Sequence, residues 1–320
     1  MSELAIVAES VLQALSAGLL IGCIYGLMCL GLSLIFGIMR VINFAQGEFL
    51  MLGMYFAFYA MAAFGALGIL GPLVGPFVAA LLAAPALFVF GYLLHLLLVR
   101  RVTGVRAVGT EGEGHYAQLI LTLGISLIVA NGSLVAFGSF PQVVKTPLSS
   151  TAWELGPLYG DFVLVFVNQA RAWSSLVSIA AAIGLVLFMS RSALGKSLLA
   201  AADNPEAAIY MGIDVDRAHR IAFAIGTAVT AVAGGLVATY YPFQPYVGIE
   251  FVIIMYAGVV LGGIGSVSGA FLGGLSIGLV QQLSTLVLPI QLQNAAIFVM
   301  FLLVVMFRPH GLFGRSAERT

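Results

Sequence analysis

Residues 190–220 read SRSALGKSLLAAADNPEAAIYMGIDVDRAHR and separate two long apolar runs. Acidic and basic side chains are much denser here than in the runs on either side. The pattern is typical of a polar loop that carries a short amphipathic helix. Two interpretations are open: the helix contacts another protein in the cytoplasm, or the stretch is an ordinary solvated loop.

The expected helix covers residues 203–212. Asn204 is a suitable N-cap, and Pro205 is tolerated in a first helical turn because its missing N–H would have no partner there. Glu206 follows where a carboxylate favours the positive end of the helix dipole. Gly212 provides a stop, because glycine adopts the left-handed conformation that ends many helices.

Composition places the chain in a membrane. It is 61% hydrophobic and only 8% charged, with a mean hydropathy of +1.10, whereas soluble domains carry about 25% charged residues. We expect an all-α polytopic membrane protein, a single domain over residues 1–320 with about eight or nine transmembrane helices, some of them broken or re-entrant. Cys23 and Cys29 fit no zinc or disulfide spacing and are expected to pack in the interior.

Nine apolar passes can be counted along the chain, two of which are short. The first lacks a basic region before it, so we expect a retained span rather than a cleaved signal peptide. A loop of low apolar density, residues 139–171, separates the fourth and fifth passes. The expected passes are residues 10–39, 49–64, 76–99, 117–138, 172–189, 221–240, 248–260, 270–288 and 295–307.

The basic residues predict the orientation. With residues 190–220 in the cytoplasm and the passes alternating, Arg40, residues 100–116 and the C-terminal tail also lie inside. Only Lys145 and Arg171 of the 13 Lys and Arg residues then lie outside, as the positive-inside rule requires. The N-terminus is expected outside the cell and the C-terminus inside.

Two interruptions of the apolar pattern resemble each other in position. Residues 40–48 read RVINFAQGE and residues 262–274 read GGIGSVSGAFLGG. Paired broken segments in the two halves of a membrane protein indicate a transport site near the midplane. Non-helical backbone at that depth persists only inside protein or beside a water-filled cavity.

The first interruption gathers Arg40, Asn43, Gln46 and Glu48. Polar and charged groups in the membrane are costly, so they are usually paired or functional. Arg40 is expected to extend to the cytoplasmic surface, and Glu48 can be satisfied at a helix N-terminus. We nonetheless expect Asn43, Gln46 and Glu48 to line or stabilise a polar pathway. Weaker pathway candidates are Tyr25, Gln118, Thr122 and Asn131.

Motifs of enzymes are absent or incomplete in the sequence. Gly195-Lys196-Ser197 resembles the end of a phosphate-binding loop, but Ser190 stands where the first glycine should be. The four His residues form no HExxH pair, so neither a metal site nor a catalytic residue is expected. Glycines of the second interruption are better explained by close helix packing; they are Gly262, Gly263, Gly265 and Gly269.

Three stretches, taken together in this order, resemble a known family: RVINFAQGEFLMLG, GGIGSVSGAFLGG and FRPHGLFG, at residues 40–53, 262–274 and 307–314. The chain resembles the LivH-type permease of branched-chain amino acid ABC importers over nearly its whole length. Residues 206–212 are also similar to the EAA motif that couples importer permeases to their ATPases, although the later part of that motif is absent. The residues assigned to the coupling helix are Asp203, Asn204, Pro205, Glu206, Ala207, Ala208 and Gly212.

The resemblance implies a larger assembly in a bacterial inner membrane, with the N-terminus in the periplasm. Two permease subunits, this chain with a LivM-type partner or a second copy, would surround one path through the lipid bilayer. Two ATP-binding subunits would hold ATP-Mg, a periplasmic binding protein would deliver substrate, and this chain would bind no cofactor and no nucleic acid. The expected activity is non-catalytic import by alternating access.

Alternatives differ in cargo or in class. The same permease family can move urea, short amides or aromatic acids, and the permease sequence does not discriminate these. A secondary transporter would need ion-coupling carboxylates deep in the spans, where Glu48 is the sole candidate. A structural membrane protein would have no ATPase partner.

Overall fold

The structure is a computed structural model that describes residues 3–102, 113–156, 164–308 and 311–313. Within these residues seven helices are long and apolar enough to cross a membrane, and two shorter apolar helices accompany them. Nine apolar helices in the described residues thus correspond to the nine expected passes, and the seventh and ninth are the two short ones. Their bounds are α1 (Glu3–Met39), α2 (Gln46–Leu67), α3 (Gly75–Leu97), α4 (Glu113–Phe137), α6 (Gln169–Arg191), α9 (Val215–Val237), α10 (Val247–Gly262), α11 (Val267–Ser284) and α12 (Gln293–Phe307).

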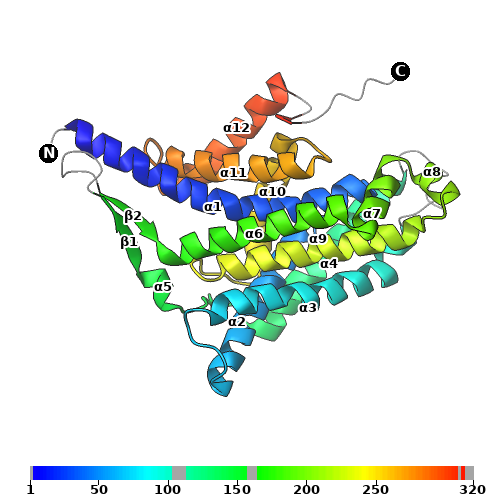
Figure 1. Cartoon of the computed structure of the whole chain (residues 1–320), viewed down its shortest axis with the longest axis horizontal. Helices are drawn as coiled ribbons and strands as arrows, with labels where there is room; N and C mark the ends of the chain where they lie inside the picture. Colours follow the sequence, from blue (N-terminus) through cyan, green and yellow to red (C-terminus); the bar gives the residue numbers. More distant parts are fainter. Residues whose placement is uncertain (1–2, 103–112, 157–163, 309–310, 314–320) are drawn as a thin grey trace.

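Helix α1 is the central element of the fold. It runs through the middle of the helical layer in Figure 1, and 83% of its most apolar stretch is buried. Glycines four residues apart, at Gly18, Gly22 and Gly26, face the backbone of α11. Because these positions have no side chain, the two helix backbones come into direct contact, as small residues permit in lipid.

Helix α9 is the second buried span, packed between α1, α2 and α3. Its small residues again allow close approach: Gly226 faces the α1 backbone at Gly31, and Gly234 and Gly235 face α2 and α3. Helices α1 and α9 thus form a core around which the more exposed spans pack.

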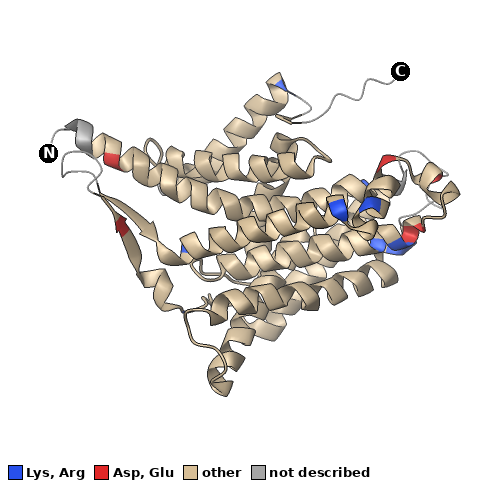
Figure 2. Ribbon diagram, in the orientation of Figure 1, with Lys and Arg blue, Asp and Glu red and all other residues tan. Residues whose placement is uncertain are grey.

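The two ends of the molecule differ in structure and charge. One end carries α5 (Pro147–Ser150) and the antiparallel pair β1 (Ala152–Leu155) and β2 (Val165–Asn168), in which Ala152 pairs with Asn168. The opposite end carries α7 (Ala193–Asp203) and α8 (Pro205–Tyr210) (Figure 1). Lys and Arg gather near α7 and α8, together with several acidic residues (Figure 2).

Within the loop expected over residues 139–171, the structure has a β-hairpin that the sequence analysis does not predict. The side chain of Gln13 holds it to α1, because its amide donates to the Phe166 carbonyl (2.7 Å) and accepts from the Phe166 N–H (2.9 Å). Trp153 and Trp173 contact each other beside this hairpin. Residues 157–163 lie outside the described part of the chain.

The glycine contact between α1 and α11 predicts a selective loss of stability. A Cβ at Gly22 would lie 2.6 Å from the Leu275 carbonyl oxygen, so Gly22→Ala should destabilise the protein by about 1–3 kcal/mol through overpacking. The measurement is the thermal unfolding midpoint in detergent. Gly124→Ala is the control, because no atom lies within 4 Å of the added Cβ; equal midpoints for the two variants would contradict the contact.

Candidate functional site

The loop between α6 and α9 folds into two short helices. Asn204 is the N-cap of α8: its Oδ1 accepts from the Ala207 N–H (3.0 Å), Pro205 is the first helical residue and Glu206 lies in the first turn. Gly212 then ends the segment with φ +79°, and the Ile213 N–H returns to the Ala208 carbonyl (2.9 Å). The cap and the stop predicted from the sequence are confirmed.

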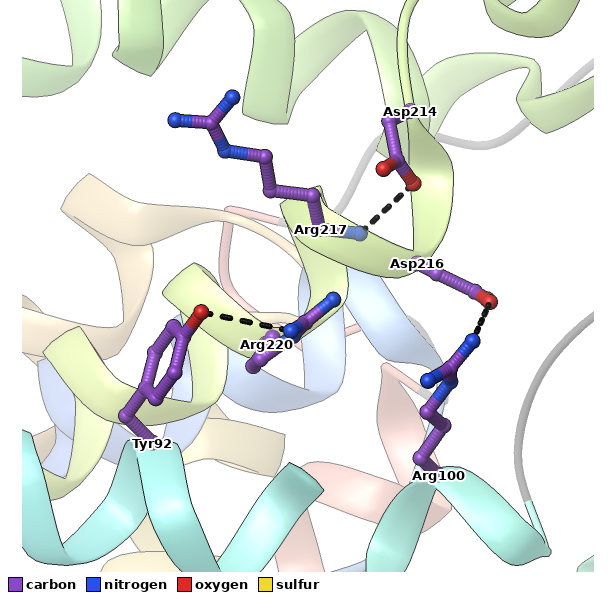
Figure 3. A network of polar contacts seen from close by, with 6 residues as sticks. All are labelled: Tyr92, Arg100, Asp214, Asp216, Arg217 and Arg220. Atoms are coloured by element: carbon purple, nitrogen blue, oxygen red, sulfur yellow. Dashed lines mark hydrogen bonds and ion pairs between the residues drawn. The ribbon is translucent and has the colours of Figure 1, made fainter.

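Three features of this segment differ from the expectation. Asp203 is the last residue of α7 rather than the first of the 203–212 helix. Helix α7 itself was not predicted; its signal is Ser192, whose hydroxyl caps the Gly195 N–H (2.8 Å). Helix α9 also begins earlier than residue 221, because Asp214 caps it through the Arg217 N–H (3.0 Å; Figure 3).

The tip of α8 exposes large apolar side chains. Tyr210 is 89% exposed, Met211 81% and Ile209 47%. They project from the end of the molecule that carries most of the charged loop residues (Figure 2). A capped helix that presents contiguous apolar groups beside charged ones has the character of a protein–protein contact.

The first interruption lies inside the protein. After α1 the chain turns at Arg40, which is exposed and has φ +54°, and residues 41–45 lead back toward the interior. Asn43 and Gln46 are fully buried, with the Asn43 amide donating to Gln46 Oε1 (3.0 Å). Gln46 in turn donates to the Gly226 carbonyl (3.2 Å) and to the Thr230 hydroxyl.

Glu48 lies in the first turn of α2, at a helix N-terminus as the sequence predicted. Its side chain is 1% exposed and packs against the backbone of Gly248. Oε1 accepts from the Ser126 hydroxyl (3.3 Å), while Oε2 has no hydrogen-bond partner among the described residues. Carboxyl groups buried with a free oxygen are uncommon and often functional.

This polar cluster is level with the middle of two helices that are long and apolar enough to cross a membrane. Gly226 and Thr230 lie near the middle of the 23-residue α9, and Ser126 lies near the middle of the 25-residue α4. Groups bonded to these residues are therefore level with the centres of two spanning helices.

The second interruption is a four-residue turn between α10 and α11. Gly263 and Gly265 have φ of +97° and +85°, a conformation that favours glycine. Beside the turn, Gly262 and Gly269 allow the two helix backbones to touch. The C-terminal segment covers the turn, because the Leu312 N–H donates to the Leu261 carbonyl (2.8 Å).

Helix α4 presents a stripe of polar residues, three of them four residues apart. Thr122 donates to the Ile42 carbonyl (3.3 Å), and the Gln118 amide donates to the Val102 carbonyl (3.3 Å). Asn131 accepts from the Tyr246 hydroxyl (3.2 Å). Gln118, Thr122 and Ser126 share one face of α4 and form the stripe, whereas Asn131 lies on the opposite, exposed face; Ser126 is not among the residues predicted from the sequence.

Tyr25 lies apart from this stripe. Its hydroxyl donates to Gln281 Oε1 (3.0 Å) on α11 in a buried contact. The structure therefore places Tyr25 in helix packing rather than beside the α4 stripe.

Tyr241 and Glu250 form a polar contact between α9 and α10. Burial, together with the neighbouring Glu250 carboxylate, raises the pKa of Tyr241 to about 12. The protonated hydroxyl donates to Glu250 Oε2 (3.2 Å).

Thr230 and Ser126 could not be singled out from the sequence, because hydroxyl residues in spans commonly bond their own helix. In the described part of the chain no group of three His, Cys, Asp or Glu side chains could hold a metal ion.

Within the described residues, nine apolar helices and the buried polar breaks between them are those of a multi-pass membrane protein. The family model described as "Branched-chain amino acid transport system / permease component" matches residues 14–307, and the chain belongs to this family.

Several curated relatives cover nearly the whole chain. It is 31% identical to the high-affinity branched-chain amino acid transport system permease protein LivH of Escherichia coli K12, over 95% of this chain and 96% of the relative. Identity to the corresponding protein BraD of Pseudomonas aeruginosa is also 31%, with the same coverage. A probable LivH of Methanocaldococcus jannaschii is 30% identical over 81% of this chain and 76% of its own. No solved structure matches.

The hydrogen bonds of Gln46 predict a loss of stability when they are removed. Gln46→Leu leaves buried polar partners on α9 unsatisfied, which costs about 1–3 kcal/mol, and should lower the thermal unfolding midpoint. Ser10→Ala is the control, because Ser10 is exposed and bonds within its own helix (2.9 Å to the Ile6 carbonyl). A Gln46→Leu variant as stable as the control would show that the cluster does not hold α2 against α9.

Proposed function

We propose that this chain is the transmembrane permease subunit of an ATP-driven ABC importer that moves branched-chain or related amino acids from the periplasm to the cytoplasm. The observation that carries the proposal is α8: a capped six-residue helix between two membrane spans, with an apolar tip that is left exposed. Membership of the permease family supports the same conclusion.

Helix α8 is the contact with the ATP-binding subunit. Ile209, Tyr210 and Met211 would fill an apolar groove of that subunit, while Glu206 and Asp203 face its polar rim. Because α7 and α8 connect directly to α6 and α9, movement of the docked helix reaches both spans. The coupling-helix assignment of Ala207 and Ala208 is part of this proposal.

The substrate path follows the polar stripe of α4 beside Asn43, Gln46 and Glu48. These groups would lie near the middle of the membrane, and the contact of Glu48 with Gly248 of α10 would close the path in this conformation. In the alternating-access cycle, the breaks at residues 40–45 and 263–266 would re-pack and expose the path to one side at a time. Arg40 would lie at its cytoplasmic end.

The orientation proposed places α7 and α8 in the cytoplasm and the β-hairpin in the periplasm of a bacterial inner membrane. A second permease subunit, LivM-type or another copy, would complete the path. Two ATP-binding subunits would carry ATP-Mg, and a periplasmic binding protein would deliver the cargo. This chain would contribute no nucleotide site and no catalysis.

The cargo follows from the names of the relatives, which are branched-chain amino acid permeases. Urea, short amides and aromatic acids are the alternatives within the family. Binding of radiolabelled leucine to the periplasmic partner, with urea and phenylalanine as competitors, discriminates between them.

Substitution of Gly212 should uncouple transport. Gly212→Ala forces a side chain into the left-handed conformation, at a cost of about 1–2 kcal/mol, and so shifts the end of α8. We expect a severalfold loss of substrate-stimulated ATP hydrolysis by the full complex in vesicles, with normal membrane insertion.

Gly68→Ala is the matched control for this variant. Gly68 also has positive φ and open space around it, but it ends α2 away from α8. Stimulation that is lost equally in both variants, or kept in both, would contradict the role of α8 in coupling.

Cysteine labelling tests the path. Asn43→Cys, Gln46→Cys and Glu48→Cys should react with a membrane-impermeant thiol reagent in one transport state and be protected in another. Wild-type protein is the background control, because Cys23 and Cys29 are free and buried. Absence of labelling in every state, with and without ATP and the loaded binding protein, would remove these residues from the path.

A further inference from the structure

A cavity of about 550 Å³ opens between α3, α6 and α9. Its floor contains the buried residues Leu27 and Leu185, and its walls include Phe88, Phe188 and Ile225. The lining is apolar throughout, and all of it except Leu194 of α7 belongs to helices long and apolar enough to cross a membrane. Ligand cavities commonly measure about 300–1,000 Å³, so this groove is large enough to hold a hydrophobic chain.

Basic and polar side chains lie at the end of the groove nearest α7. Residues one turn apart share a helix face, so Tyr92 continues the face of Phe88 and Arg217 continues the face of Ile221. Figure 3 shows Arg220 reaching Tyr92, with Arg217 extending from the same turn of α9.

Arg220 carries a positive charge that no carboxylate neutralises among the described residues. Its guanidinium lies 5.3 Å from the centre of the Tyr92 ring and donates to the Tyr92 hydroxyl (3.3 Å). Its Nε is buried and has no hydrogen-bond partner in the described part of the chain. The side chain is therefore held in place with donor capacity left over.

The nearby acidic groups have other partners. Asp214 accepts from the backbone N–H of Arg217 (3.0 Å), and Asp216 pairs with Arg100 (3.6 Å; Figure 3). The guanidinium of Arg217 forms no ion pair with any described residue. Arg217 and Arg220 thus lie beside an apolar groove, and neither has a carboxylate partner among the described residues.

We propose that this groove binds one anionic phospholipid, with an acyl chain between α3, α6 and α9 and the phosphate at Arg217 and Arg220. Arginine forms strong charge-assisted hydrogen bonds with phosphate. Basic pockets between spanning helices on the cytoplasmic side are typical anionic-lipid sites. A helix from a partner protein would fill the groove without neutralising the arginines, so charge favours the lipid.

A second groove provides an internal comparison. It measures about 380 Å³ between α1, α6 and α11 and is equally apolar. At its α11 end lie Val267 and Ser268, and the preceding turn, residues 263–266, has no charged residue. By the same one-turn rule Arg191 follows Leu187 on α6, so this groove has one basic residue at its end rather than two and is expected to select anionic lipid more weakly.

The charge test uses the full complex in nanodiscs of mixed phosphatidylethanolamine and phosphatidylglycerol. Native mass spectrometry should show phosphatidylglycerol retained in preference to phosphatidylethanolamine. Arg217→Gln and Arg220→Gln should each lower this retention by about fivefold, as expected for the loss of one basic contact. Arg308→Gln, at the end of α12, is the control that removes a charge elsewhere.

The shape test fills the groove without disturbing the packing. Gly184 lines the groove and has no atom within 4 Å of an added Cβ. Gly184→Leu should therefore abolish lipid retention. Its thermal unfolding midpoint should be equal to or higher than that of the wild-type protein without lipid. Gly124→Leu, in equally open space on α4, should keep the lipid. Equal retention of both lipids by wild type, or retention unaffected by the arginine and Gly184 variants, overturns the proposal.

Discussion

The fold depends on one constraint: a backbone polar group in hydrocarbon must find its partner inside the protein. Helix α1 meets this condition by itself, but residues 40–45 do not, because they leave the helical pattern within the membrane. Their polar groups are satisfied by side chains instead. Asn43 Oδ1 accepts from the Ala45 N–H (3.2 Å), and Thr122 donates to the Ile42 carbonyl. The break is therefore tied both to itself and to α4, while Gln46 ties it to α9.

The same constraint explains the use of glycine. The α10–α11 turn has few side chains to offer its backbone, so its glycines adopt positive φ and let neighbouring backbones approach closely. The Leu312 N–H then reaches Leu261 across the turn. The break at residues 40–45 is held by hydrogen bonds from polar side chains, and the turn at residues 263–266 is held by contacts between backbones. The two segments that are proposed to re-pack are therefore stabilised by different interactions.

The sequence predicts much of this architecture, because hydropathy and turn residues are local properties. The nine passes, the Asn204 cap and the Gly212 stop follow from residues close together in the chain. The partners of Gln46 and Glu48 do not, since Thr230 and Ser126 are distant in sequence and resemble other hydroxyl residues in spans. The β-hairpin does not follow from the sequence, because β2 is held to α1 by Gln13, more than a hundred residues away. Helix α7 does not follow from the sequence either, because its Ser192 cap comes directly after the last residue of α6. The hydrogen bond of Tyr25 could not be predicted, because its partner Gln281 is distant in the chain, on α11.

The central claim is that α8 docks on an ATP-binding protein, and site-specific photo-crosslinking in native membranes tests it most directly. A photoreactive side chain at Tyr210, which is 89% exposed, should form an adduct with an ATP-binding subunit. The same group at Phe140, 79% exposed and distant from α8 in the chain, should not. Adducts from Tyr210 with lipid or periplasmic proteins alone would contradict the account.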